Sequence, residues 1–110
     1  MVEMNRKFSI IATALILAAC GQESAIQKSV RGSLKDPESA KFGESTVLDN
    51  KFACMTVNAK NSMGGYTGNQ QALLVKKDGE WIVAEIDQMS HDECKRLMNG
   101  LNEELSKKEK

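Results

Sequence analysis

Residues 70–87 read QQALLVKKDGEWIVAEID and contain the pattern that decides the fold. Asp78-Gly79 separates two apolar runs, and Asp-Gly in that position is typical of a two-residue β-hairpin turn. Pairing outward from the turn gives three cross-strand pairs: Val75 with Ile82, Leu74 with Val83, and Leu73 with Ala84. Both faces of this hairpin carry apolar residues, so we expect it to lie centrally in its sheet and to be covered on each side.

A second hairpin is predicted over residues 41–58. Asp49-Asn50 supplies two residues that tolerate positive φ, and apolar residues flank it. In a register set by a two-residue turn, Val47 opposes Phe52 and Ser45 opposes Cys54. These four side chains would share one face, and Ala53, Met55 and Val57 would lie on the other.

Helical periodicity appears on both sides of the hairpins. Ile26, Val30 and Leu34 follow i, i+4, i+8 spacing, which predicts a helix over residues 21–34. Asp36 before Pro37 then favours a short turn, with Asp36 as its cap.

The second helix is predicted to begin after Ser90. Ser90 and Glu93 form a capping box, and apolar residues at helical spacing continue to Leu105. The predicted fold is therefore α+β: a four-stranded antiparallel meander of two hairpins, flanked by an N-terminal and a C-terminal helix. A single domain is expected over residues 22–106, with a frayed tail at 107–110.

Composition restricts the class of protein. The 110 residues suffice for one small domain, and 15 basic residues balance 15 acidic ones. No basic stripe is present, which argues against nucleic acid as a partner.

The N-terminal segment has the three parts of an export signal. Arg6 and Lys7 supply positive charge, residues 8–17 form an apolar run, and small residues then lead to Cys20. The run is shorter than the roughly 20 residues needed to cross a bilayer. Met4 is a more usual signal start than Met1, because acidic Glu3 precedes it.

Leu17-Ala18-Ala19-Cys20 resembles the lipobox of bacterial lipoproteins. The resemblance implies cleavage after residues 1–19, diacylation of the Cys20 sulfur, acylation of its new amino group, and a lipidated tether at residues 20–21. Gly21 after Cys20, instead of Asp, resembles the outer-membrane sorting pattern of Gram-negative lipoproteins. The expected location is the outer membrane, facing the periplasm. The alternative is an ordinary cleaved signal with Cys20 merely nearby.

The remaining cysteines are Cys54 and Cys94. An even pair in an oxidising exported compartment is expected to form a disulfide. Cys54 lies on a predicted strand and Cys94 in the first turn of the C-terminal helix, so the bond would tie the helix to the sheet. The alternative is a reactive thiol, which neither a CxxC spacing nor a neighbouring basic cluster supports.

The connection between the hairpins, residues 58–69, reads NAKNSMGGYTGN. It combines three glycines, three asparagines and the only tyrosine, and can present backbone amides and an aromatic ring. Unstructured loops of this length are uncommon in compact domains, which favours a function in binding. The alternative is a flexible connection. The candidate binding residues are Asn58, Lys60, Asn61, Gly64, Gly65, Tyr66 and Gly68.

Two segments resemble a group of small exported and prophage-associated bacterial proteins. Residues 34–42, LKDPESAKF, match the LxDPxSAxF segment of the group, and residues 57–68, VNAKNSMGGYTG, match its VNAKNxxGGYxG segment. The similarity covers residues 30–83. Members often carry an aromatic residue a few positions beyond GGYxG, where this chain has Ala72-Leu73-Leu74. The resemblance implies no reaction and directs attention to the loop.

We expect no catalytic or metal site and no cofactor. Consecutive residues Ser90-His91-Asp92 point in different directions and cannot form a triad, so a structural role at the helix cap is expected for His91. One histidine and an oxidised cysteine pair are a poor zinc ligand set. Glu85 and Asp87 alternate on a strand as a carboxylate pair or, alternatively, as solvated charges. GGYTG lacks the Lys-Ser/Thr step of a phosphate loop.

The sequence therefore predicts a lipid-anchored periplasmic interaction module that is not an enzyme. Its partners would be the membrane, through the anchor, and an envelope protein or glycan, through Lys60 and Tyr66. A prophage-type role in modifying an envelope receptor rests on the resemblance alone. The alternative is a structural envelope lipoprotein that supports an assembly. A packed Tyr66 would favour this alternative, and a protruding Tyr66 would favour recognition.

Overall fold

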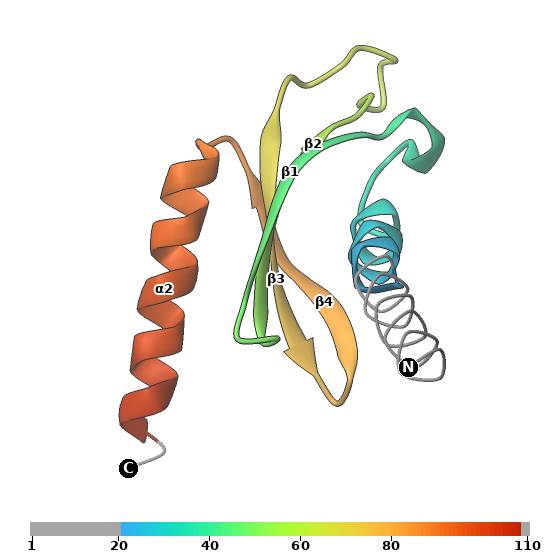
Figure 1. The fold of residues 1–110 in the computed structure, drawn as a ribbon. Helices are drawn as coiled ribbons and strands as arrows, with labels where there is room; N and C mark the ends of the chain where they lie inside the picture. Colours follow the sequence, from blue (N-terminus) through green and yellow to red (C-terminus); the bar gives the residue numbers. More distant parts are fainter. Residues whose placement is uncertain (1–20, 109–110) are drawn as a thin grey trace, which may run out of the picture.

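The computed structural model describes residues 21–108 and shows a four-stranded sheet between two helices (Figure 1). In chain order, the elements are the described part of the N-terminal helix (21–31), the 3₁₀ helix η1 (Pro37–Ser39), β1 (Lys41–Leu48), β2 (Phe52–Asn58), β3 (Gln70–Lys77), β4 (Glu80–Asp87) and α2 (His91–Lys108). The strand order is β1-β2-β3-β4, and every neighbouring pair is antiparallel. The predicted α+β meander is confirmed. The predicted signal peptide, Cys20 and the last two residues of the predicted tail lie outside the described residues.

Each face of the sheet is covered by one helix (Figure 1). Ile26 and Val30 of the N-terminal helix are fully buried against one face. Cys94 and Met98 of α2 are buried against the other. Side chains alternate between faces along a strand, so β2 is apolar on both sides and sits inside the sheet.

The β3–β4 hairpin has the predicted turn but a different register beyond it. Asp78 and Gly79 both have positive φ, as the turn requires. The predicted pairs Val75–Ile82 and Leu74–Val83 are confirmed. The predicted partner of Leu73 is wrong: Leu73 pairs with Glu85, because β4 contains a bulge at Ala84. The prediction that this hairpin lies centrally is also wrong for β4, which forms an edge of the sheet.

The bulge exchanges the faces of the residues that follow it. Ile86 now pairs with Ala72 and packs into the core beneath the N-terminal helix. Glu85 and Asp87 are thereby turned to the α2 side of the sheet. Partial burial of Ile86 against this core favours the shift, since an unbulged strand would place this apolar side chain on the opposite face.

The predicted register of the first hairpin is wrong by one residue. Leu48 pairs with Phe52, so the connection contains three residues, with Lys51 in addition to Asp49-Asn50. Asp49 and Asn50 have φ of 51° and 55°, as the turn prediction requires. The Lys51 carbonyl accepts a hydrogen bond from the Lys76 amide of β3 over 2.8 Å, and the Lys51 amide donates to the Leu48 carbonyl at the end of β1 over 3.0 Å.

This one-residue shift changes which β1 side chains face α2. Cys54 pairs with Thr46, and Val47 pairs with Ala53. The predicted Val47–Phe52 and Ser45–Cys54 pairs therefore do not form, although the division of β2 between its two faces is as predicted.

The N-terminal helix ends at residue 31, earlier than the predicted Leu34. Amide-to-carbonyl bonds from Ser33 to Val30 (2.9 Å) and from Leu34 to Arg31 (3.1 Å) tighten the chain into i→i+3 turns. The short turn at Pro37 is confirmed as η1, but the Asp36 side chain makes no capping bond. Its carbonyl accepts from the Ser39 amide and hydroxyl instead.

α2 extends to Lys108, beyond the predicted end near Leu105. Lys107 and Lys108 occupy its last turn, where positive charge is favourable to the helix dipole. The cap at Ser90 is confirmed, because the Glu93 amide donates to the Ser90 hydroxyl over 3.1 Å. Of the helices in residues 21–108, none has both the length and the apolarity that crossing a bilayer requires.

Candidate functional site

The predicted binding loop has a defined conformation of its own. Lys60 and Tyr66 form an isolated antiparallel bridge, and the Thr67 amide donates to the Ala59 carbonyl over 3.1 Å. The loop therefore extends β2 as an irregular hairpin. Ala59 is buried beneath it, which anchors the loop to the sheet.

Asn61 closes the tip of this loop. Its side-chain oxygen accepts from the amides of Met63 (2.9 Å) and Gly65 (3.2 Å). Its backbone amide donates to the Gly65 carbonyl over 2.8 Å, and its carbonyl accepts from Gly64 over 3.0 Å. Gly64 has a φ of 84°, a conformation that glycine adopts without strain.

The base of the loop is closed by Asn58 in a similar way. Its side-chain oxygen accepts from the Gly68 amide over 3.0 Å, and Gly68 has a φ of 87°. Gln88, just after β4, donates to the Thr67 carbonyl over 3.0 Å. The predicted asparagines and glycines thus shape the loop, on which Tyr66 is 42% exposed and Lys60 is half-buried.

Two sequence segments meet at this loop. The Lys60 amide donates to the Ser39 hydroxyl over 2.8 Å, and the Tyr66 hydroxyl donates to the Ser39 carbonyl over 3.4 Å. The Lys41 ammonium lies 4.6 Å from the centre of the Tyr66 ring, and that of Lys60 lies 5.6 Å from it. We call Ser39, Lys41, Lys60, Met63 and Tyr66 together the Tyr66 surface.

Exposed groups of several kinds gather on the Tyr66 surface. Tyr66 is 42% exposed and Met63 is 93% exposed. Within residues 21–108, neither Lys41 nor Lys60 forms an ion pair with a carboxylate. The surface therefore offers an aromatic ring, an apolar side chain and two ammonium groups that remain able to donate hydrogen bonds.

Ser39 and Lys41 were absent from the predicted binding residues. Their signal was present in the sequence, because both lie within LKDPESAKF, the first of the two segments that carry the family resemblance. The contact joins residues 27 positions apart, Ser39 and Tyr66, so local pattern alone does not reveal it.

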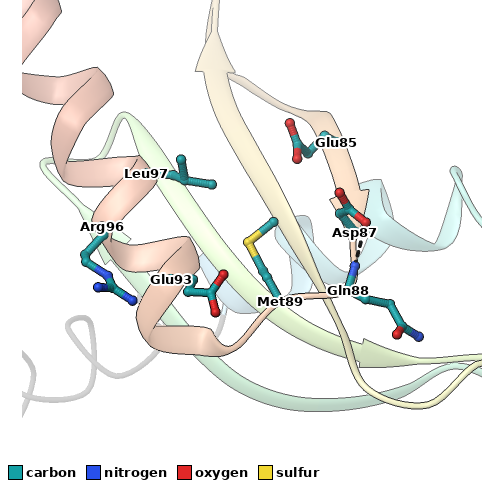
Figure 2. A pocket seen from close by; sticks show the side chains of 7 residues that line it. All are labelled: Glu85, Asp87, Gln88, Met89, Glu93, Arg96 and Leu97. Atoms are coloured by element: carbon teal, nitrogen blue, oxygen red, sulfur yellow. Dashed lines mark hydrogen bonds between the residues drawn. The ribbon is translucent and has the colours of Figure 1, made fainter.

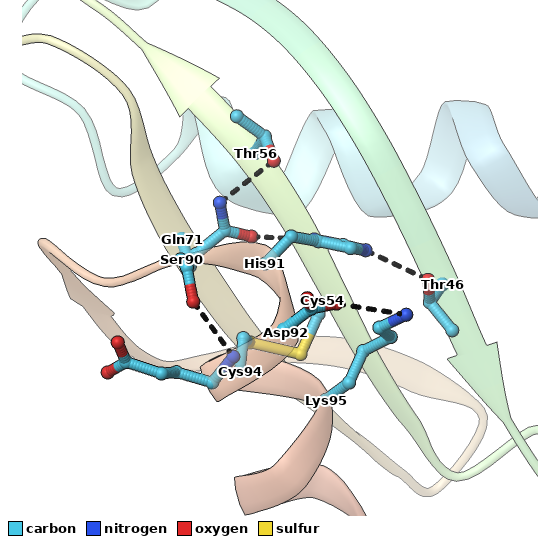
Figure 3. Close-up of a disulfide and its surroundings, with 10 residues drawn as sticks. Thr46, Cys54, Thr56, Gln71, Ser90, His91, Asp92, Cys94 and Lys95 are labelled. Atoms are coloured by element: carbon cyan, nitrogen blue, oxygen red, sulfur yellow. Dashed lines mark hydrogen bonds and ion pairs between the residues drawn. A yellow bond between two sulfur atoms is a disulfide. The ribbon is translucent and has the colours of Figure 1, made fainter.

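The predicted disulfide joins β2 to α2 (Figure 3). The Cα atoms of Cys54 and Cys94 are 6.1 Å apart, and both side chains are fully buried. The pair lies between sheet and helix, where no surface presents it to a substrate. This geometry supports the predicted structural disulfide and not the alternative of a reactive thiol.

His91 links α2 to the sheet (Figure 3). Its Nε2 lies 2.9 Å from the Thr46 hydroxyl, and its Nδ1 lies 2.8 Å from the Gln71 side-chain oxygen. The buried Gln71 amide in turn donates to the Thr56 hydroxyl over 2.8 Å. Both ring nitrogens of His91 therefore have hydrogen-bond partners on the sheet. The neighbouring Ser90 hydroxyl accepts from the Glu93 amide and is not bonded to His91.

Glu85 and Asp87 line an open hollow of about 590 Å³ between the end of β4 and the first turns of α2 (Figure 2). Both are exposed, and the same hollow is lined by Glu93, Arg96 and Leu97. In the described part of the chain, no three His, Cys, Asp or Glu side chains are grouped so as to hold a metal ion.

Comparison with known proteins adds no relative to this description. No protein-family model, curated protein or solved structure matches the chain.

Proposed function

We propose that this protein is a lipid-anchored envelope protein whose Tyr66 surface binds a second envelope component, either a protein or a glycan. The observation that carries the proposal is the loop itself. Its hydrogen bonds hold Tyr66 and Lys60 in place, yet Tyr66 remains 42% exposed and Met63 93% exposed. A preordered exposed aromatic loses little conformational entropy when it binds.

The position of the loop relative to the anchor supports this function. The Gln22 side chain donates to Asn50 over 2.6 Å, which places the start of the N-terminal helix beside the β1–β2 turn. Ser39 and the Tyr66 surface lie at the other end of β1 (Figure 1). A strand of this length spans about 25 Å. Because Cys20 is bonded to Gly21, acyl chains on Cys20 would attach at the end away from the Tyr66 surface.

The chemistry of the surface favours a partner with hydrogen-bond acceptors. The two lysines each bring an ammonium group, and tyrosine is enriched among residues that dominate binding energy. Carboxylates and hydroxyls of an envelope protein or glycan are suitable acceptors. The narrower prophage-type role, in which a receptor is blocked or modified, is supported by the family resemblance alone.

One observation favours the structural alternative. The Tyr66 hydroxyl bonds to the Ser39 carbonyl, so the ring also braces the loop against η1. In that alternative, Tyr66 stabilises a component of an envelope assembly and contacts no partner. The two functions predict different results for a folded variant that lacks the Tyr66 ring. A binding surface would lose its partner, and a structural component would keep its partners.

The test is chemical crosslinking and pull-down from envelopes. Tyr66→Ala should weaken partner capture by about 30-fold or more, since a tyrosine at the centre of an interface contributes 2 kcal/mol or more. Lys60→Ala should also reduce capture. Tyr66→Phe retains the ring and should bind nearly as well as wild type, although it loses the bond to Ser39.

Lys51→Ala is the matched control, because Lys51 is an exposed lysine in the β1–β2 turn at the other end of β1. It should leave partner capture unchanged. Circular dichroism and the intact disulfide verify the fold of each variant. If Tyr66→Ala and wild type capture identical partners in equal amounts, the proposed binding surface is wrong.

A further inference from the structure

Met63 is the most exposed sulfur-containing residue in residues 21–108, because its side chain stands 93% exposed at the tip of the loop. The other sulfur-containing residues of this range are buried or half-buried: Met55, Met89, Met98, Cys54 and Cys94. The two cysteines are already joined in the disulfide. An oxidant in solution should therefore meet the Met63 sulfur first.

The Met63 side chain is not needed to shape the loop. Among the hydrogen bonds of the loop, Met63 contributes only its backbone amide, which donates to the Asn61 side-chain oxygen over 2.9 Å. The remaining bonds of the tip join Asn61 to Gly64 and Gly65. A chemical change at the Met63 sulfur should therefore leave the loop conformation intact and alter only the group that the loop presents to a partner.

A peroxide can change that group in one step. The sulfur lone pair attacks one oxygen atom of hydrogen peroxide, the O–O bond breaks, and the products are methionine sulfoxide and water. The thioether loses two electrons to the peroxide, and a thiol-dependent reductase can return them, with a disulfide and water as the products. The apolar, adaptable thioether suits a binding surface, whereas the sulfoxide is polar and costs free energy when it is buried without hydrogen-bond partners.

We propose that Met63 is an oxidation site that regulates the Tyr66 surface. The thioether form binds the partner, and oxidation by hydrogen peroxide to the sulfoxide weakens that binding. This regulation rests on the function proposed above and adds to it a redox-sensitive residue. The buried disulfide cannot serve as this sensor, because its sulfur atoms are already oxidised and are covered by the sheet and α2.

The first test is the selectivity of the oxidation. The full-length protein in detergent is exposed to dilute hydrogen peroxide, and peptide mass spectrometry follows each methionine. Met63 should gain one oxygen atom at least about 10-fold faster than Met55 and Met98, whose oxidation requires local opening of the fold. Circular dichroism should show no change, and the disulfide should remain intact.

The second test is the capture of the partner from envelopes that have not been oxidised. Protein that carries the Met63 sulfoxide, freed of peroxide, should capture the Tyr66-dependent partner about 10-fold or more weakly, which is the loss expected when one methionine no longer contributes its apolar burial. Treatment with methionine sulfoxide reductases should restore capture.

Two conservative variants serve as matched controls. Met63→Leu keeps an apolar side chain of similar volume, so it should bind as wild type does and should keep its binding after peroxide treatment. Met89→Leu removes a half-buried methionine and keeps Met63. It should lose binding after peroxide treatment as wild type does.

Two results would overturn the proposed regulation and leave the binding surface standing. One is oxidation of Met63 no faster than that of Met55 and Met98. The other is an oxidised protein that keeps a partner which Tyr66→Ala loses. An equal loss of capture by peroxide-treated Met63→Leu would also overturn it, because another residue would then be responsible. If Tyr66→Ala keeps every partner, the proposed binding function is wrong and the regulation fails with it, even where oxidation of Met63 is selective.

Discussion

Removing the disulfide with Cys54→Ala and Cys94→Ala together should lower the free energy of unfolding by about 4 kcal/mol. The two cysteines are 40 residues apart in sequence, so the bond restricts a large loop in the unfolded chain. Small domains typically have 5–15 kcal/mol of stability in total, and this loss is therefore a large fraction of it. Urea unfolding monitored by circular dichroism measures the change.

The structure indicates which part of the molecule should respond most. Cys94 is one of the two buried residues of α2, and Met98 is the other. Without the bond, α2 should show the largest increase in amide hydrogen exchange, while β2 and β3 retain most of their protection. Met98→Ala, which removes the other buried contact and keeps the disulfide, is a useful comparison. A loss below about 1 kcal/mol in the double variant would contradict the role assigned to the bond.

Replacing Cys20 should abolish lipid attachment. Wild type should incorporate labelled fatty acid, and Cys20→Ser should incorporate none, whereas the Cys54→Ala, Cys94→Ala variant should incorporate as much as wild type. Each buried CH₂ contributes about 0.8 kcal/mol to membrane binding, and stable anchoring takes two or more chains. The effect on fractionation should therefore be nearly complete.

Cell fractionation tests the anchor only if the export signal is also cleaved from Cys20→Ser, because an uncleaved apolar signal would itself hold the variant at the membrane. An ordinary cleaved signal in place of residues 1–19 keeps the apolar run from holding Cys20→Ser at the membrane. The processed variant should then appear in the soluble periplasmic fraction with its disulfide intact. Continued membrane binding of this processed variant, equal to that of wild type, would refute the anchor.

The local signals in the sequence predicted the fold well. Asp78-Gly79 set the β3–β4 turn and the first pairs beside it, because turn chemistry acts over a few residues. The bulge at Ala84 depends on the packing of Ile86 beneath the N-terminal helix, which is distant in sequence. The Lys51 shift likewise depends on a backbone bond to β3. Both errors arise from contacts that a local pattern does not contain.

In the candidate site, too, the features set by local sequence were predictable and those set by contacts between distant residues were not. The asparagines and glycines of the loop were predictable, because their residue types suit turns and positive φ. The role of Ser39 was not predictable from spacing, since its hydroxyl and carbonyl meet Lys60 and Tyr66 only after the sheet has formed. The partial exposure of Leu97 and Leu101 was hidden for a related reason. Both read as core residues until the position of α2 on β2 is known.

The central claim is that the loop end of the molecule contacts a partner in the envelope. Met63 is the best position for a direct measurement, because it is 93% exposed at the loop tip and only its backbone amide takes part in the loop hydrogen bonds. A photoreactive amino acid at Met63 should yield a discrete adduct on irradiation of intact cells. The same amino acid at Lys51, in the β1–β2 turn, should not yield this adduct. Equal labelling from both positions, or no adduct from Met63, would contradict the claim.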